Sequence, residues 1–410
     1  MIGAVELALP RADAAASAGV VDVRGRITRY LVLEIFLIFF QGFMVAPLVP
    51  RLAHTFGTDI DRAGTLVPAY ALPFGIVCLV VGPLADRYGR ANVLRYLLGA
   101  AIVVPVLTVT AATFGGLFGW RIAAGIALGG IAPITLAMVA EMYPYAERGR
   151  PVGWIFGAIA GGMAIGATAG PWLEPSIGWR GLFLVVGVAN VAVVAPLARA
   201  LALRPSAWTH GPSIRPRDIA RAYAALLRTR RGATVYGYVF LNGVFHSGVF
   251  SWLGVFFIER YHLAPRELGF ALLGYGIPGF LLGPVVGRLA DRFGRRWLIR
   301  GGFVLAGVCA LVLAAPLPAL AVTVTITALS FGFDLSHPLL AGIVTSLDPV
   351  RTAQAMALNT FTIFIGLGVG SLVFGVLRAA VGFSPAFVCF GIFQLAIAAA
   401  SLVLFDRSWR

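Results

Sequence analysis

The sequence contains no lysine, so all 32 of its basic residues are arginines, and charged residues make up only 12% of the chain. Hydrophobic residues account for 59%, and the mean hydropathy is +0.90. A soluble domain of ordinary composition is about 45–50% apolar and about 25% charged. A chain this poor in charge cannot cover its surface with polar groups in water. The composition therefore excludes an ordinary soluble protein and indicates a lipid environment.

Several kinds of functional site are also absent from the sequence. Without lysine there is no phosphate-binding glycine loop of the kind that ATP-driven pumps use. Cys78, Cys309 and Cys389 all fall in apolar runs without metal-ligand spacing, so we expect apolar fillers and neither a disulfide framework nor a metal site. No Ser-His-Asp arrangement indicates catalysis. We therefore expect a protein that is not an enzyme and that holds no cofactor.

Long apolar runs fill most of the chain, and twelve of them reach the roughly 20 residues that cross a bilayer as a helix. Pro316 and Pro318 divide the one stretch, 301–333, that is too long for a single span. We therefore predict an all-α membrane protein with twelve transmembrane helices. The predicted spans are 30–50, 65–84, 93–113, 117–140, 152–172, 181–203, 234–258, 267–287, 297–315, 319–341, 353–376 and 384–405.

The longest link between spans, 204–233, falls between the sixth and the seventh. It divides the chain into two six-helix bundles, 30–203 and 234–405, with tails at 1–29 and 406–410. Part of the link, "RDIARAYAALLRTRR", has the pattern of a short basic amphipathic helix on the inner leaflet, although a solvated tether explains it equally well. These lengths predict an internal repeat of six helices.

The formal net charge of +15 arises from arginines in the short links between spans. With both termini placed inside the cell, 25 of the 32 arginines fall in inner segments, which is the bias that orients membrane helices. The charge therefore predicts topology, with both termini cytoplasmic, and gives no reason to expect a nucleic-acid partner. The first apolar run is too long for the core of a signal peptide.

One arginine-rich phrase occurs twice, half a chain length apart, as "GPLADRYGR" and "GRLADRFGRR". Each copy lies at the inner end of an even-numbered span. We expect the first glycine of each copy to allow close helix approach and the second to adopt a left-handed backbone at the helix end. The aspartate is expected to bond a nearby arginine or to cap the next helix. The arginines are expected to hold the loop on the inner side of the membrane. The residues are Gly82, Asp86, Arg87, Gly89 and Arg90 in the first copy, and Gly287, Asp291, Arg292, Gly294 and Arg295 in the second.

This phrase, in two copies at half-chain spacing among twelve spans, closely resembles the loop that follows the second and eighth helices in the major facilitator superfamily. The resemblance covers the whole chain. It implies two six-helix bundles related by a pseudo-two-fold axis, with a central cavity that opens alternately to each side. It also implies that Asp86 and Asp291 act in a latch that holds the outward-open state, with simple helix capping as the alternative.

Two further motifs carry the resemblance. "GWRIAAGIALGG" resembles the family's fourth-helix motif, in which Arg121 acts in a proton relay or else snorkels to the outer interface. Gly162, Gly166 and Gly170 form a small-residue stripe for close helix contact and resemble the antiporter motif of proton-driven exporters. Ala167 stands where that motif has proline, which weakens the antiporter interpretation.

Ionisable and polar residues inside predicted spans are candidates for proton coupling or substrate contact, because charge is costly in a bilayer. Asp334 and His337 are three apart and share a helix face, next to Pro338, which is expected to break the helix and open a cavity. A structural buried pair, or a wet pair near the helix end, is the alternative. The other candidates are Glu34, Gln41, Arg121, His246 and Asn359.

Taken with the resemblance, these residues imply a secondary transporter of the bacterial inner membrane that acts as a monomer. Its partners would be the lipid bilayer, a small-molecule substrate and the proton. Proton-coupled efflux of a drug, sugar or metabolite is the preferred function. A proton-coupled importer and a non-transporting membrane sensor with the same fold are the alternatives.

Overall fold

The structure, a computed structural model, describes residues 11–144, 147–202, 216–275, 285–286, 288–290, 292–348 and 351–405. These residues form helices joined by short turns, with no strand among them. Ten of the described helical segments are long and apolar enough to cross a membrane.

The N-terminal half contains α1 (Arg11–Phe43), η1 (Ala46–Leu48), α2 (Val49–Phe56), α3 (Ile60–Gly64), α4 (Leu66–Tyr88), α5 (Arg90–Thr108), α6 (Phe114–Leu128), α7 (Ile131–Met142) and α8 (Gly149–Ala202). Next comes α9 (Pro216–Arg228), which confirms that part of the link is helical. The C-terminal half contains α10 (Arg230–Phe250), α11 (Leu253–Tyr261), α12 (Pro265–Ala271), α14 (Arg295–Leu313), α15 (Ala319–Val344), α16 (Thr352–Val381) and α17 (Phe383–Leu404).

The helix α8 accounts for two of the predicted spans, 152–172 and 181–203. Gly178 bends it, with φ 70° and ψ 165°, and helix continues on both sides of the bend. The predicted span 267–287 begins in α12, and about half of it, 276–284 and 287, lies outside the described residues. The fold is therefore the predicted all-α arrangement of about twelve membrane helices.

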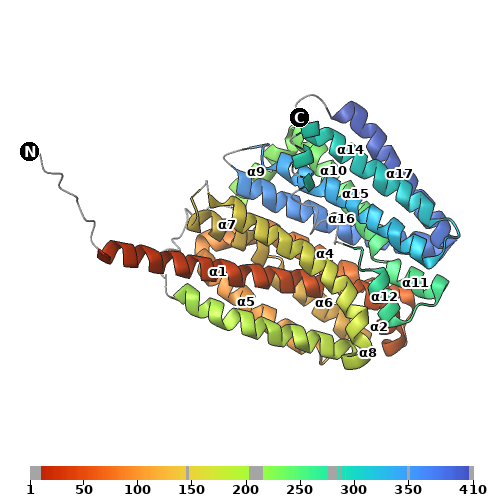
Figure 1. Cartoon of the computed structure of the whole chain (residues 1–410), viewed down its shortest axis with the longest axis horizontal. Coiled ribbons are helices and arrows are strands. Elements are labelled where there is room, and N and C mark those ends of the chain that lie inside the picture. The colour runs from red at the N-terminus through yellow and green to blue at the C-terminus, as the bar shows by residue number, and fades with distance from the viewer. Residues whose placement is uncertain are drawn as a thin grey trace, which may run out of the picture.

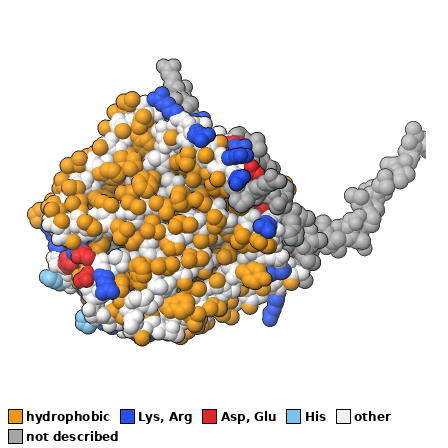
Figure 2. Space-filling model, turned by 180° about the vertical axis from the view of Figure 1, so that it is seen from behind, with side chains coloured by type: hydrophobic (Ala, Val, Ile, Leu, Met, Phe, Trp, Pro, Cys, Tyr) orange, Lys and Arg blue, Asp and Glu red, His pale blue; other side chains and the backbone are white. Residues whose placement is uncertain are grey.

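Successive long helices run in opposite directions, so the molecule has two ends. We call the end that holds Gly89 and Phe405 the terminal end, and the end that holds the turns at Gly57 and Gly382 the distal end. The helices of the two halves form two groups, with α2, α11 and α12 together at the distal end (Figure 1). Hydrophobic side chains cover most of the visible surface, and charged side chains gather toward its edges (Figure 2). This distribution fits a multi-pass membrane protein surrounded by lipid.

Three glycines of α8 bring it into backbone contact with α1. A Cβ atom at Gly162 or Gly166 would lie only 2.5 or 2.4 Å from a carbonyl oxygen of α1, and one at Gly170 would lie 2.9 Å from the carbonyl oxygen of Met44, just after α1. Real Cβ atoms do not approach other atoms so closely, so only glycine permits this distance between the helices. The stripe therefore joins the first and fifth predicted spans inside the N-terminal bundle.

The first helix does not begin at its apolar run. It begins at Arg11, so residues 11–29 of the predicted tail extend the first membrane helix. Thr28 has no exposed surface, and its Oγ1 lies 2.8 Å from the hydroxyl of Tyr143. Arg24 stacks over the same ring, 4.3 Å from its centroid. These contacts with the end of α7 hold the polar continuation of the helix against the bundle, which hydropathy alone does not predict.

The first copy of the repeated phrase forms the turn between α4 and α5. Gly89 has φ 87° and ψ 128°, and Gly294 in the second copy has φ 85° and ψ 139°. Both φ values are positive, as expected, although these ψ values lie outside the left-handed helical region. Asp86 accepts hydrogen bonds from Arg90 at 3.2 and 3.0 Å, and Arg90 also pairs with Glu141 of α7. The carboxylate of Asp86 thus bonds within its own bundle.

Other residues of the phrase differ from expectation or cannot be placed. The prediction of close helix approach at Gly82 is wrong within the described part of the chain, because a Cβ atom there would have no neighbour within 4 Å in it. Arg87 and Arg292 are exposed, and each lies over the aromatic ring of the next residue. The guanidinium of Arg295 lies near Gly342 of α15. Gly287 and Asp291 lie outside the described residues.

Two prolines free backbone carbonyls that other helices then bind. Pro83 has no N–H, so the carbonyl of Leu79 lacks a partner within α4. The hydroxyl of Tyr223 in α9 donates to that carbonyl at 2.9 Å. Burial raises the pKa of Tyr223 to about 12, so the hydroxyl keeps its proton at neutral pH. In the same way Pro133 frees the carbonyl of Gly129, and the Cys78 thiol donates to it at 3.1 Å.

Candidate functional site

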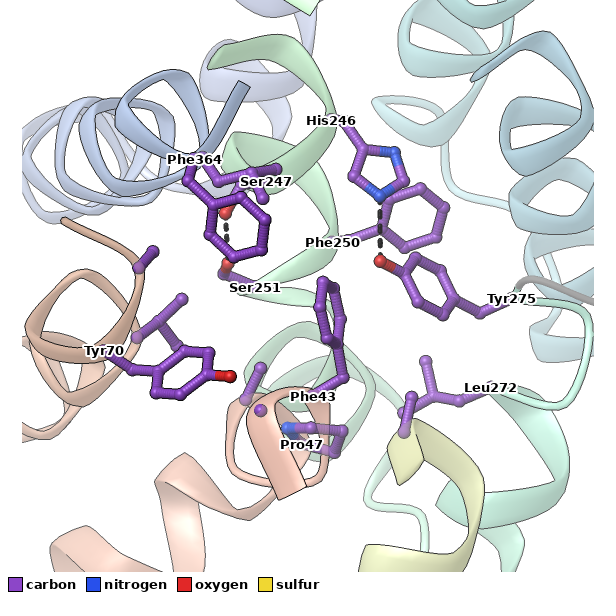
Figure 3. Close-up of a pocket in the computed structure, with 16 residues that line it drawn as sticks. Phe43, Pro47, Tyr70, His246, Ser247, Phe250, Ser251, Leu272, Tyr275 and Phe364 are labelled. Atoms are coloured by element: carbon purple, nitrogen blue, oxygen red, sulfur yellow. Dashed lines mark hydrogen bonds between the residues drawn. The ribbon is translucent and has the colours of Figure 1, made fainter. Parts of the chain in front are cut away.

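A pocket lies between the two bundles, and both contribute to its wall (Figure 3). The N-terminal half supplies residues of α1, η1, α4 and α8, and the C-terminal half supplies residues of α10, α16 and the turn after α12. The lining residues are Gly42, Phe43, Ala46, Pro47, Val67, Tyr70, Ala71, Ala167, His246, Ser247, Phe250, Ser251, Leu272, Tyr275, Phe364 and Leu367. Its position between two pseudo-equivalent bundles makes it the candidate functional site.

The end of α1 shapes one wall of the pocket. Regular helix stops at Phe43 and a short 3-10 turn containing Pro47 follows, so the last carbonyls of α1 lack helical partners. Arg121 of α6 donates to the carbonyls of Gln41 and Gly42 at 3.4 and 3.2 Å. It also donates to the carbonyl of Leu66 at 3.2 Å, and its guanidinium lies 4.5 Å from the centre of the Tyr70 ring.

Arg121 therefore does not snorkel to an interface, because only 2% of it is exposed. A positive charge at the C-terminal end of a helix is favourable, since the helix dipole is negative there. The side chain fixes the broken end of α1 against α4 and supports Tyr70 from behind. The sequence offered no sign of this arrangement, because the break in α1 and the arginine are far apart along the chain.

The two bundles touch at the distal end of the pocket. Arg378 of α16 pairs with Asp61 of α3 and, at 3.3 Å, with Glu259 of α11. A Cβ atom at Gly64 would lie 2.5 Å from the Trp252 ring, and one at Gly254 would lie 2.9 Å from Pro47. Each of these two glycine contacts also joins one half of the chain to the other. The distal end is thus closed by charge pairing and by close packing.

Aromatic rings meet on the terminal side of the pocket. Phe74 of α4 and Phe364 of α16 stack with their centroids 4.1 Å apart, and Phe39 approaches Phe364 edge-on at 6.3 Å. A Cβ atom at Gly368 would lie only 2.4 Å from the side chain of Leu72. These contacts join α1 and α4 directly to α16, so the pocket lies between a charged distal closure and an aromatic terminal one.

His246 of α10 is one of the polar residues in the C-terminal wall. Its Nε2 atom lies 2.8 Å from the hydroxyl oxygen of Tyr275, while its Nδ1 has no hydrogen-bond partner among the described residues. The imidazole stacks on Phe333 at 3.8 Å, and Phe333 in turn stacks on His337 at 5.1 Å. Asp334 follows Phe333 directly in α15, near the Tyr275 hydroxyl.

The structure thus brings together three of the predicted candidates at one wall of the pocket, with His246 in the wall and Asp334 and His337 behind it. Pro338 does not break α15, which continues to Val344, so the expected break is wrong. The carbonyl of Asp334 loses its helical partner to Pro338, and a membrane helix tolerates such a loss within a bundle. Tyr275 was missed at the sequence level, because a tyrosine in an apolar run has no pattern that predicts its partners.

The remaining candidates lie apart from this group, and none lines the pocket. Glu34 is completely buried in α1, and in the described part of the chain neither of its carboxyl oxygens has a hydrogen-bond partner. The side-chain nitrogen of Gln41 and the side-chain oxygen of Asn359 are also buried and have no hydrogen-bond partner among the residues that the structure describes. An ionised carboxylate in such surroundings carries a large desolvation cost, which keeps Glu34 a candidate for proton binding. Among the described residues, no group of three or more histidine, cysteine or acidic side chains could hold a metal ion.

Comparison with known proteins gives the family. The model of the Major Facilitator Superfamily matches residues 31–265 and again residues 238–408. The uncharacterized MFS-type transporter YceJ of Bacillus subtilis (strain 168) is 27% identical over 346 residues, which is 83% of this chain and 86% of that protein. The chloramphenicol resistance protein of Streptomyces lividans is 26% identical over 339 residues, which is 81% of this chain and 83% of that protein.

Solved structures agree on the fold. A bacterial homologue of the human lysosomal transporter Spinster, inward-facing and unoccupied, superposes with a TM-score of 0.74 at 18% identity, over 94% of this chain and 98% of that one. A POT family transporter bound to a thioalcohol-conjugated peptide gives a TM-score of 0.75 at 14% identity, over 93% of this chain and 96% of that one. The helical repeat, the pocket between two bundles and the double match to one family model lead to one conclusion: this chain belongs to the Major Facilitator Superfamily and is a membrane transporter.

Proposed function

We propose that this protein exports a small molecule from the cell in exchange for protons, by alternating access at the pocket between its two bundles. The observation that carries the proposal is the hydrogen bond between His246 and Tyr275 in the pocket wall, with Asp334 and His337 beside it. An imidazole changes charge in the physiological pH range more readily than any other side chain. The same wall therefore supplies both a solute surface and a proton acceptor.

In the proposed cycle, the free Nδ1 of His246 takes a proton when the pocket is open to the proton-rich side. In the resulting imidazolium, Nε2–H donates to the Tyr275 hydroxyl, and the carboxylate of Asp334 is the counter-charge that we propose for it. His337 is the second ionisable group facing His246, and its own protonation would oppose that of His246. A proton drives transport only if it binds the two conformations with different affinity. In such a cycle the ion pair between Arg378 and Asp61, which joins the two bundles, would form in one conformation and break in the other.

Export is favoured over import by a relative. The Streptomyces lividans protein is named for chloramphenicol resistance, and removal of a compound from the cell is one way to resist it. The glycine stripe of α8 supports the same direction, since it follows the pattern of proton-driven exporters apart from Ala167. The arginine bias supports both termini on the cytoplasmic side of the inner membrane.

The test has two stages. Cells that lack or overproduce the protein are screened against toxic compounds and sugars, and the solute whose tolerance or retention changes is then studied in proteoliposomes. A one-unit pH gradient supplies about 1.4 kcal/mol per proton, so exchange of one proton per solute predicts about tenfold accumulation. Collapse of the gradient with a proton carrier is the control. Solute accumulation that does not depend on the gradient would contradict proton coupling. The absence of any solute movement would favour a non-transporting sensor.

A further inference from the structure

The described residues of the pocket wall are rich in aromatic rings and carry few charged groups. None of the described lining residues is aspartate, glutamate or arginine, and the one titratable group with an ordinary pKa near neutrality is His246. Five rings other than His246 line it: Phe43, Tyr70, Phe250, Tyr275 and Phe364. We infer that the pocket binds an uncharged solute that carries an aromatic ring and a hydrogen-bonding group. This inference deepens the transport function proposed above and rests on it.

The rings come from both bundles and face a common space. Phe43 reaches toward the centre of the group, with Tyr70 on one side and Tyr275 on the other (Figure 3). Phe250 meets Tyr275 edge-on with centroids 4.0 Å apart, and Phe43 lies 6.3 Å from Tyr275. Aromatic rings prefer such tilted and offset arrangements. A planar aromatic solute can therefore join the set and contact both bundles at once.

The polar atoms form a short strip on one face of α10. Ser247 and Ser251 are one helical turn apart, and their hydroxyl oxygens lie 2.9 Å from each other. Two hydroxyl groups bonded to each other share one proton, which leaves the second proton and the remaining lone pairs for a solute. The Tyr70 hydroxyl lies on the facing wall (Figure 3). Neutral hydroxyls on both walls suit an alcohol, amide or nitro group better than a full charge.

The nearest full charges belong to residues behind the wall. Arg121 lies behind the Tyr70 ring and already donates to three backbone carbonyls. Asp334 is not among the described lining residues. While His246 is neutral, a charged solute entering the pocket would lose its water and find no opposite charge among the described lining residues, which is unfavourable. An uncharged solute avoids that cost.

Matched probes test the inference on the purified full-length protein by titration calorimetry in detergent. Chloramphenicol is compared with its succinate ester, which adds one negative charge to the same ring system. The neutral 4-nitrobenzyl alcohol is compared with 4-nitrobenzyl trimethylammonium, which carries a positive charge. We expect each neutral probe to bind at least about tenfold more tightly than its charged counterpart, because burial of an unpaired charge is costly. Equal binding of either charged probe, or no binding of the neutral probes in the millimolar range, would overturn the inference.

Two variants locate the binding. Phe250→Leu should weaken chloramphenicol binding about three- to tenfold, the range of one aromatic contact, while Phe270→Leu, a change at an exposed ring, should not. Ser251→Asp should reverse the preference toward the trimethylammonium probe by placing a carboxylate in the polar strip. An unchanged preference in Ser251→Asp, or equal effects of the two phenylalanine variants, would overturn this site.

The proposed function and this inference can fail separately. If the protein binds the neutral probes tightly but transports nothing, the proposed function is wrong and this inference stands. If a pH gradient drives transport of a charged solute, the proposed function stands and this inference is wrong.

Discussion

Arg378 of α16 forms ion pairs with Asp61 of α3 and with Glu259 of α11, and of these two pairs only the one with Asp61 joins the two bundles. Only 11% of the Arg378 side chain is exposed, and its guanidinium also lies 4.9 Å from the centre of the Trp252 ring. The arginine is therefore held within the C-terminal half, and Asp61 reaches it from the other half. Substitution of Asp61 should therefore break the ion pair between the bundles while Arg378 keeps its partners in the C-terminal half.

Asp61→Asn is expected to open the distal end. Loss of a partly exposed ion pair costs about 1 kcal/mol, so the ratio of closed to open molecules should fall about fivefold. Spin labels at the exposed positions Thr55 and Arg266, in a variant without native cysteines, measure the distance across this end. Glu259→Gln is the matched control, because it removes a pair within one bundle. Identical distance distributions for Asp61→Asn and the parent would contradict the closure.

Arg121→Met is expected to destabilise the protein by about 2–4 kcal/mol, because three buried carbonyls lose a charged donor. The loss should appear as a lower unfolding temperature in detergent. Arg95→Gln provides the comparison, since Arg95 is exposed and donates a hydrogen bond to Asn92 on the same helix. If Arg121→Met unfolds at the same temperature as Arg95→Gln, the bonds to α1 and α4 do not carry the stability assigned to them.

Gly166→Ala is expected to lower the stability of the N-terminal bundle by about 1–3 kcal/mol, because its Cβ atom would lie 2.4 Å from the carbonyl oxygen of Phe40. Gly157→Ala on the same helix is the matched control, since a Cβ atom there has no described neighbour within 4 Å. Alanine favours a helix by about 1 kcal/mol over glycine, so the control should be neutral or slightly stabilised. Equal unfolding temperatures for the two variants would show that α1 and α8 can separate at no cost.

Tyr223→Phe is expected to loosen α9 without affecting the membrane helices, because it leaves the Leu79 carbonyl without a donor. The loss of one such hydrogen bond is about 1 kcal/mol. Hydrogen exchange of the backbone amides in α9 should speed up about fivefold, while exchange in α4 beyond Leu79 stays the same. Unaltered exchange in α9 would mean that its buried residues Ala222 and Leu226 hold it in place without the tyrosine.

The spans were predictable because each depends only on a run of apolar residues, and the turns at Gly89 and Gly294 because glycine is required where φ is positive. Contacts between distant segments were not. The role of Arg121 depends on where α1 breaks, and the partners of Tyr275 depend on how α10 and α15 pack. Gly82 was misjudged for the same reason, since sequence does not reveal which side of a helix faces a neighbour. Asp334 and His337 were found because charge inside a span is rare.

Proton exchange at His246 is the central claim, and His246→Gln tests it most directly. Glutamine can still bond the Tyr275 hydroxyl but cannot take up a proton, so the variant separates hydrogen bonding from charge. In proteoliposomes the variant should exchange labelled for unlabelled solute at close to the parent rate, while accumulation driven by a one-unit pH gradient falls from about tenfold to none. Accumulation by His246→Gln equal to that of the parent, with exchange intact, would contradict the account.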